Sequence, residues 1–216
     1  MAVLGKVYSF PDDYRVQRIQ AIAAMNGLTL EIVPDIGYFD MDKPTLRNKF
    51  PLAQFPAFET PDGSLRLVGP GPIARFVAES GPMASQLLAG AGGDAATRAL
   101  VDQWLFIADQ VLGVPLIQMV AINRNFKDYY YETYEGYKMD VTIGYQSVDD
   151  TLKDGQKFLV GEQLTLADIM LASALHVAQP SMTNATLWNK KTVDYTKRIM
   201  ELPEMKAVFP EEQQRW

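Results

Sequence analysis

The first third of the chain alternates short apolar runs with turn signals. Residues 3–10 and 28–33 have the length and the β-branched content of strands. Residues 14–26 between them show helical spacing and end at Gly27, a common helix stop. The pattern therefore predicts a β-α-β unit at the N-terminus.

A second set of short elements follows this unit. Residues 56–60 and 64–68 flank Pro61-Asp62-Gly63, a strong turn signal, so they should form a hairpin. Residues 72–79 have the pattern of a short helix with proline in its first turn. Residues 35–48 should form an irregular loop with a helical turn, packed through Tyr38 and Phe39. The order β-α-β, then β-β-α, is that of a thioredoxin-like sheet.

Beyond about residue 82 the pattern contains helices only. Residues 83–88 begin this half, residues 90–93 form a glycine-rich turn, and Asp94 should cap a long helix that Pro115 kinks or ends. Apolar positions recur in it at helical spacing: Leu100, Trp104, Ile107, Ala108 and Val111. Further helices are predicted over residues 129–153, over residues 191–201 and from Pro203 onward.

The helix with the clearest start begins at Thr165. Thr165 and Asp168 form a capping-box pattern, in which each residue accepts a hydrogen bond from the backbone N–H of the other. Residues 169–178 are apolar on nearly every face, which predicts a helix buried within a helical layer. His176, the only histidine, lies in this helix; we interpret it as a neutral core residue rather than a catalyst or a metal ligand.

The predicted fold class is α/β plus all-α. A thioredoxin-like domain covers residues 1–80, an all-helical domain covers residues 83–216, and the link lies around residues 79–82. A chain of 216 residues is long enough to bury a core in this arrangement.

Composition and charge remove several classes of function. The net charge of −6 argues against a surface for nucleic acid or anionic membrane, because both need clustered Lys and Arg. There is no cysteine, hence no disulfide, thiolate metal site or cysteine nucleophile. The N-terminus lacks the apolar run of a signal peptide, and no later segment suggests a membrane span. We expect a cytoplasmic protein without a metal.

Few motifs with established chemistry are present. We find no P-loop, dinucleotide-binding glycine motif or nucleophile elbow. A run of tyrosines could line a hydrophobic substrate pocket, although its helical spacing favours packing in the core or at a dimer contact: Tyr129, Tyr130, Tyr131, Tyr134 and Tyr137.

The pair Phe55-Pro56 precedes a predicted strand. Proline is tolerated there at the first residue of a strand or in a turn. A cis bond would present the backbone N–H and C=O of Phe55 at the sheet edge, where an extended peptide could pair with them. A trans proline that merely begins the strand is the alternative.

Several stretches resemble one superfamily. FLVGEQLTLADI (158–169) is similar to the start of the core helix in cytosolic glutathione transferases. The opening run 5–27, the segment KFPLAQFPAF (49–58) and residues 86–104 resemble the transferase-like domain of the elongation factor 1-gamma family. Its characteristic opening positions correspond to Tyr8, Pro11, Asp12, Asp13, Tyr14 and Arg15. The resemblance covers nearly the whole chain and implies the glutathione transferase fold.

The resemblance also implies a glutathione-binding set. In transferases the residue before a cis-proline binds the cysteinyl part of glutathione, which corresponds to Phe55 and Pro56, with Gln54 beside them. A Glu/Gln-Ser pair at the start of the next helix holds the glutamyl part, and the matching positions are Gly69 and Pro70. Because Pro70 has neither hydroxyl nor N–H, we expect the thiol site to be altered.

A thiol-activating hydroxyl near the end of the first strand is a further implication. Tyr8, Ser9 and Tyr14 carry hydroxyls there, and Arg15 could add a positive field. Tyr8, Ser9 and Arg15 are therefore the catalytic candidates. Tyr8 could equally pack between sheet and helix with its hydroxyl at the rim.

Two functions remain open at this point. The first is a scaffold domain of the translation elongation factor 1B complex, which would bind the guanine-nucleotide exchange subunit and support recycling of elongation factor 1A. The second is an enzyme that conjugates glutathione, or a related thiol, to electrophiles. No cofactor is required in either case, and glutathione is a possible substrate or ligand. The resemblance also implies a homodimer.

Overall fold

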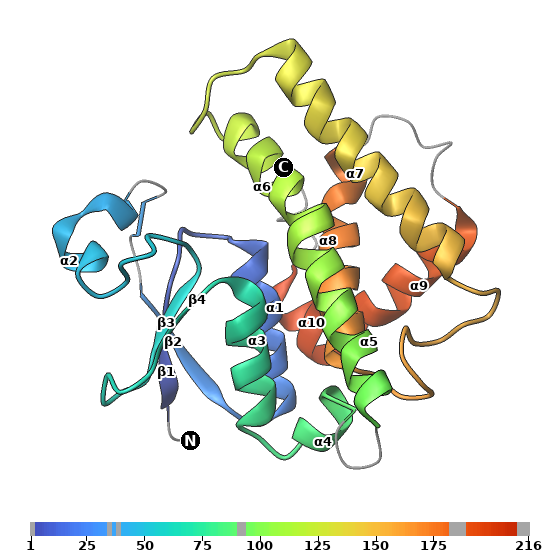
Figure 1. The fold of residues 1–216 in the computed structure, drawn as a ribbon, viewed down its shortest axis with the longest axis horizontal. Helices are drawn as coiled ribbons and strands as arrows, with labels where there is room; N and C mark the ends of the chain where they lie inside the picture. The colour runs from blue at the N-terminus through green and yellow to red at the C-terminus, as the bar shows by residue number, and fades with distance from the viewer. Residues whose placement is uncertain (1–2, 34–35, 38–39, 90–93, 182–188, 211–216) are drawn as a thin grey trace.

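The computed structural model describes residues 3–33, 36–37, 40–89, 94–181 and 189–210 (Figure 1). A small sheet with its helices lies beside a larger helical half. The expected glycine turn at 90–93 and the packing of Tyr38 and Phe39 lie outside the described residues.

Four strands form one mixed sheet in the order β2-β1-β3-β4. Strand β1 (Val3–Tyr8) runs parallel to β2 (Thr29–Val33), and β3 (Ala57–Glu59) and β4 (Arg66–Val68) form an antiparallel hairpin. Strands β1 and β3 are antiparallel neighbours. The predicted thioredoxin-like order is confirmed, with strands shorter than expected.

Helices cover one face of the sheet, and a short segment covers the other. Helix α1 (Tyr14–Met25) and helix α3 (Pro70–Glu79) pack together on the first face. The second face carries the 3₁₀ turn η1 (Asp40–Asp42) and helix α2 (Pro44–Arg47), where Leu46 and Phe50 cluster with Tyr8. The two faces thus receive alternate side chains of β1, as the pleat of a strand requires.

The second half contains helices, as expected. They are α4 (Ala84–Leu87), α5 (Ala95–Phe106), the π-helical turn η2 (Ile107–Leu112), α6 (Gly113–Asn123), α7 (Tyr131–Thr151), α8 (Leu166–Ser181), α9 (Lys190–Met200) and α10 (Pro203–Val208). One hydrophobic core runs through both halves, with α8 at its centre and α1 packed against α8 and α10.

The first long helix differs from its prediction in two respects. Pro115 falls in the first turn of α6, and the irregular turn is η2 just before it. This is physically reasonable, because a proline cannot donate to the carbonyl four residues earlier and a π turn redistributes those bonds. Leu100 and Val111 are exposed whereas Trp104 and Ala108 are buried, so the predicted apolar spacing does not mark one buried face.

The same helix corrects the expectation about membrane spans. The run Ala95–Asn123 has 29 residues and a mean hydropathy of 1.8 in its most apolar window, which is enough by length and composition to cross a bilayer. In the structure 56% of that window is buried inside the protein. A core helix passes the same test when its apolar residues face other helices.

The capping box at α8 is confirmed in one half only. Asp168 Oδ2 accepts from the Thr165 N–H at 2.8 Å, as predicted. The Thr165 hydroxyl donates to the same oxygen at 3.0 Å instead of accepting from the Asp168 N–H. Asp168 Oδ1 also accepts from the Leu159 N–H and the Tyr195 hydroxyl, so the carboxylate joins three segments of the core.

Two predictions about aromatic residues are confirmed only in part. His176 is only partly buried and contacts Phe209 edge-on, with ring centroids 6.0 Å apart. Tyr134 and Tyr137 pack against the core, as predicted. Tyr129, Tyr130 and Tyr131 are each more than half exposed, so within this protomer they do not pack in the core.

Candidate functional site

The end of β1 meets the start of β3 at the turn that leads into α1. Tyr8 pairs with Ala57 across the two strands, which brings Ser9 beside the Phe55–Pro56 bond. That bond is cis, as the resemblance implied. Phe55 is partly buried, Pro56 is buried and Gln54 is exposed.

Arg15 connects the turn with the cis-proline loop. Its Nη1 donates to the Phe55 carbonyl at 3.0 Å, while Nε and Nη2 donate to the two oxygens of Asp13 at 2.9 and 2.8 Å. Asp13 also caps α1 by accepting from the Arg15 N–H at 3.0 Å. A bidentate pair of this kind fixes the orientation of the guanidinium as well as its position. The Phe55 carbonyl, a predicted ligand group, therefore already has a donor.

The charge of Asp13 is maintained in spite of its burial. Burial opposes ionisation, but the nearby Arg15 charge and the hydrogen bonds from Arg15 and Ser9 outweigh it and lower the pKa of Asp13. Asp13 is therefore an anion at neutral pH, and the positive charge of Arg15 is largely compensated.

Ser9 contributes its proton to this cluster. Its hydroxyl donates to Asp13 Oδ2, and the residue is only 3% exposed. A serine hydroxyl has a single proton to donate. In this arrangement Ser9 presents no donor to a thiol at the cis-proline.

Tyr8 faces the opposite side of the sheet. Its hydroxyl donates to Glu59 Oε1 at 2.6 Å and accepts from Lys49 Nζ at 3.2 Å, beneath the segment that carries α2. Burial, and then the hydrogen bond to Glu59, raise the pKa of Tyr8. This is the packed alternative considered for Tyr8, and the geometry gives it no access to a thiol at the cis-proline.

The N-terminus of α3 lies next to the cis-proline loop. The Gly69 N–H donates to the Pro56 carbonyl at 2.9 Å, and Gly69 has a φ of 88°, a conformation that favours glycine. Pro70 and Pro72 supply no N–H to the first turn. The free N–H groups that make a helix N-terminus attract anions are therefore fewer here.

A buried ion pair behind this turn was not predicted. Arg18 of α1 is fully buried, and its Nη2 pairs with Asp109 Oδ1 on the π turn. Its Nη1 donates to the Met170 carbonyl of α8 at 3.2 Å. A Cβ atom added at Gly71 would lie 2.7 Å from Asp109 Oδ2. The pair thus joins both halves beside the start of α3, and no local sequence signal links residues 91 positions apart.

The described residues contain no cluster of three or more His, Cys, Asp or Glu that could hold a metal ion. The chemistry available at the site consists of hydroxyls, carboxylates and one guanidinium. Of the predicted residues, the structure brings Ser9, Arg15, Phe55, Pro56 and Gly69 together and directs Tyr8 elsewhere.

Comparison with known proteins agrees with this fold. Residues 141–203 match the family of the glutathione S-transferase C-terminal domain. A glutathione S-transferase-like protein of a Fusarium species is 36% identical over 211 residues, covering 97% of this chain and 94% of that protein. A second one, from Gibberella moniliformis, is 33% identical over 97% of this chain and 94% of its own length. The chain therefore belongs to the glutathione S-transferase-like family.

More distant relatives include elongation factor 1-gamma, the family that the opening residues resemble. Elongation factor 1-gamma of Artemia salina is 27% identical over 215 residues, and the chain spans about half of that protein, 46%. Among solved structures, the glutathione transferase URE2P8 of Phanerochaete chrysosporium, in complex with oxidized glutathione, superposes with a TM-score of 0.83. It shares 16% identity, with 100% of this chain and 96% of that chain covered, which shows a common fold.

Proposed function

We propose that this transferase-like protein is a binding domain that lacks the usual thiol chemistry of its fold. One observation carries the proposal: the hydroxyls of both catalytic candidates donate to carboxylates, Tyr8 to Glu59 and Ser9 to Asp13. The third hydroxyl considered, that of Tyr14, belongs to a side chain that is only 1% exposed. Stabilising a thiolate requires a donor aimed at the sulfur. Neither hydroxyl can provide it without leaving an ionised acceptor.

The altered α3 N-terminus supports the same proposal. Holding the carboxylate of a glutamyl group needs backbone N–H groups or a hydroxyl at a helix start. Gly69, Pro70 and Pro72 provide less of both than a Glu-Ser pair would. The thiol would therefore lose its orienting contacts as well as its activating one.

The likeness to elongation factor 1-gamma favours a particular partner. We propose that the chain binds the N-terminal region of the exchange subunit of elongation factor 1B in the cytoplasm, and so supports recycling of elongation factor 1A indirectly. The net charge of −6 is consistent with a protein partner and with no direct contact to nucleic acid or an anionic membrane.

Glutathione conjugation is the second candidate function. The retained cis Phe55–Pro56 bond beside an exposed Gln54 favours it, since this edge could receive an extended thiol peptide. Relatives described as glutathione S-transferase-like also extend over nearly the whole chain.

Titration calorimetry with glutathione, in parallel with a peptide from the exchange subunit's N-terminus, separates the two candidates. We expect tight peptide binding and no heat with millimolar glutathione. Glutathione binding at the level of a working transferase, without peptide binding, would overturn the scaffold and favour the enzyme.

Pro70→Ser is the sharper variant for the thiol site. It restores a hydroxyl and an N–H, whereas Gly69→Glu would be strained at a φ of 88°. Pro72→Ser is the matched control, because it replaces another proline of the same helical turn with serine, at an exposed position. If only the α3 contacts were lost, Pro70→Ser alone should gain glutathione affinity. With both hydroxyls of β1 engaged, we expect neither variant to respond.

We also propose that two copies associate through the face formed by α5, η2, α6 and α7. Six apolar side chains on these helices are between 39% and 61% exposed: Leu100, Phe106, Val111, Val114, Met139 and Ile143. Helix α7 packs against η2 and α6, so these residues lie on neighbouring helices. Exposed apolar residues in such a group are typical of a protein interface.

A further inference from the structure

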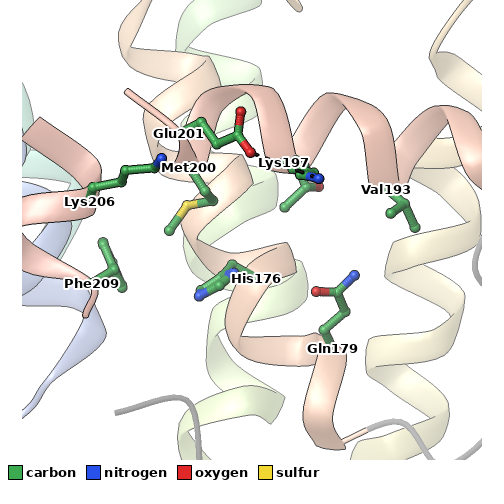
Figure 2. Close-up of a pocket in the computed structure, with 9 residues that line it drawn as sticks. His176, Gln179, Val193, Lys197, Met200, Glu201, Lys206 and Phe209 are labelled. Carbon is green, nitrogen blue, oxygen red and sulfur yellow. Dashed lines mark ion pairs between the residues drawn. The ribbon is translucent and has the colours of Figure 1, made fainter. Parts of the chain in front are cut away.

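A cavity of about 290 Å³ lies within the helical half, between α8, α9 and α10 (Figure 2). Helix α8 contributes His176 and Gln179, α9 contributes residues around Thr196 and Met200, and the end of α10 is followed by Phe209. None of these elements carries a residue of the cis-proline site. The volume is near the lower end of the range of small-molecule pockets.

The imidazole of His176 is the polar group that sets this cavity apart. Its only recorded interaction with the described residues is the edge-on contact with Phe209, and it makes no hydrogen bond with any of them. Burial lowers the pKa of His176, so the ring is neutral at neutral pH and keeps one N–H donor and one acceptor nitrogen. The ring is partly buried at the cavity wall and has no hydrogen-bond partner among the described residues, so it is a group to which a ligand can bind.

The charged groups around the cavity are mainly positive. Lys197 and Glu201 are 3.9 Å apart, a long contact between side chains that are 73% and 53% exposed, and its free energy is small. Lys206 lies on the other side of the opening, and no ion pair is recorded for it among the described residues. In Figure 2 the two lysines, Glu201 and His176 stand around the same space. The rim thus carries two cations against one anion.

The remaining wall is apolar. Val193, Met200 and Phe209 line the cavity beside the polar groups. A pocket with an apolar wall and a few converging polar groups selects ligands that combine both characters.

We propose that this cavity is a binding site for a small organic carboxylate with an apolar body, such as a medium-chain fatty acid or an aromatic acid. The apolar body packs against Met200 and Phe209. The carboxylate lies between Lys197, Lys206 and the N–H of His176, where it takes two charge-assisted bonds and one from the imidazole. This site is separate from the thiol site and does not depend on the function proposed above.

The single histidine allows a direct test, because its imidazole gives one set of NMR signals. We would titrate the protein with octanoate and follow the His176 ring signals and their pH dependence. Binding should shift these signals in a saturable way. It should also raise the pKa of His176, because a bound carboxylate favours the protonated ring.

Lys197→Gln/Lys206→Gln should weaken octanoate binding on the order of fivefold or more, because two rim charges are removed. The matched control is Lys190→Gln, which removes a lysine of the same helix that is 86% exposed and paired with Asp194 outside the cavity. A third variant, Met200→Ala, tests the apolar wall. Unshifted His176 signals up to millimolar octanoate would overturn the proposal, as would equal weakening by Lys190→Gln and by the rim variants.

Discussion

At the scale of single residues, Glu59 shows how polar contacts stabilise the second face of the sheet, the one that carries α2. Its carboxylate accepts from Tyr8 and from Lys49 at 2.6 Å each and from Arg66 at 3.3 Å. Burial works against the charge of Glu59, but the bonds from Lys49, Tyr8 and Arg66 prevail and lower its pKa to about 2. The charged form of Glu59 is therefore part of the folded structure.

This pKa predicts a specific loss of stability in acid. A carboxyl group whose folded pKa is lowered stabilises the protein above its unfolded pKa, and that contribution disappears as the pH falls toward the folded pKa. For Glu59 the window runs from its usual 4.5 down to about 2. At about 1.4 kcal/mol per pKa unit the contribution is on the order of 3 kcal/mol. Glu59→Gln should lower the free energy of unfolding at pH 7 and flatten its pH dependence in that window, as measured by urea unfolding.

Glu31→Gln is the control for this experiment. Glu31 pairs with Lys6 at 2.9 Å, but both side chains are close to half exposed, so water screens the pair. The variant should retain the pH profile of the original protein. The same flattening in Glu31→Gln would show that general surface charge, and not the Glu59 cluster, causes the acid sensitivity.

Residue roles with a local signature could be predicted from the sequence. The bond from the Thr165 N–H to Asp168 follows from their spacing, because a capping box joins positions three apart. The bond from Tyr195 to the same carboxylate joins positions 27 apart, and tertiary packing alone brings them together. Tertiary packing likewise brings Lys49 to Glu59, which lie ten positions apart in the sequence. Spacing along the chain carries no signal for such pairs.

At the scale of elements, the start of α3 packs tightly against the π turn. A Cβ at Gly71 would lie 2.7 Å from Asp109 Oδ2, and Asp109 is bound to the buried Arg18. The carboxylate cannot move away without weakening that pair. Gly71 is therefore required for the close approach of the two halves.

Gly71→Ala should accordingly destabilise the protein by about 1–3 kcal/mol, the usual range for overpacking. Thermal and urea unfolding would measure this change. Gly136→Ala in α7 is a control with the opposite sign, because a Cβ there meets nothing within 4 Å. Replacing an exposed helical glycine with alanine should stabilise the helix by about 0.5–1 kcal/mol. An unchanged free energy of unfolding in Gly71→Ala would mean that η2 and α3 are not packed tightly enough at this point to exclude a Cβ atom.

Most elements were predicted at close to their observed bounds. The predicted helices over 14–26 and 191–201 correspond to α1 and α9 within a residue at each end. The π turn was not predicted, since its hydrogen bonds depend on how Pro115 and Asp109 are accommodated in the packed core. Pattern reasoning detects periodicity, and one widened turn changes that periodicity too little to be seen.

At the scale of the whole molecule, the sequence predicted the fold but not the state of its site. The order of elements and the resemblance of residues 158–169 to a known core helix pointed to the transferase architecture. The hydroxyls of Tyr8 and Ser9 donate to Glu59 and Asp13. The positions of these carboxylates are defined only in the folded chain, so the sequence did not predict the acceptors.

The proposed dimer gives a prediction at this scale. Phe106→Asp/Ile143→Asp places two charges in the exposed apolar face, where Phe106 is 61% and Ile143 is 53% exposed. Burying unpaired charges at an interface is strongly unfavourable, so the variant should elute as a monomer in light-scattering chromatography at concentrations where the original protein is a dimer. Leu52→Asp, at a 71% exposed residue of the other half, should leave the association unchanged. A monomeric original protein would contradict the proposal.

Arg15 and Arg18 lie one helical turn apart on α1, and one bonds to the Phe55 carbonyl while the other pairs with the π turn of the second half. The cis-proline loop and the contact between the halves are consequently both held by side chains of the same helix, α1. Substitutions that change the angle between the halves during evolution would also reorient the sheet edge at Phe55–Pro56, where we propose that a peptide can pair. Binding preference in such a protein can therefore diverge through residues that never touch a ligand.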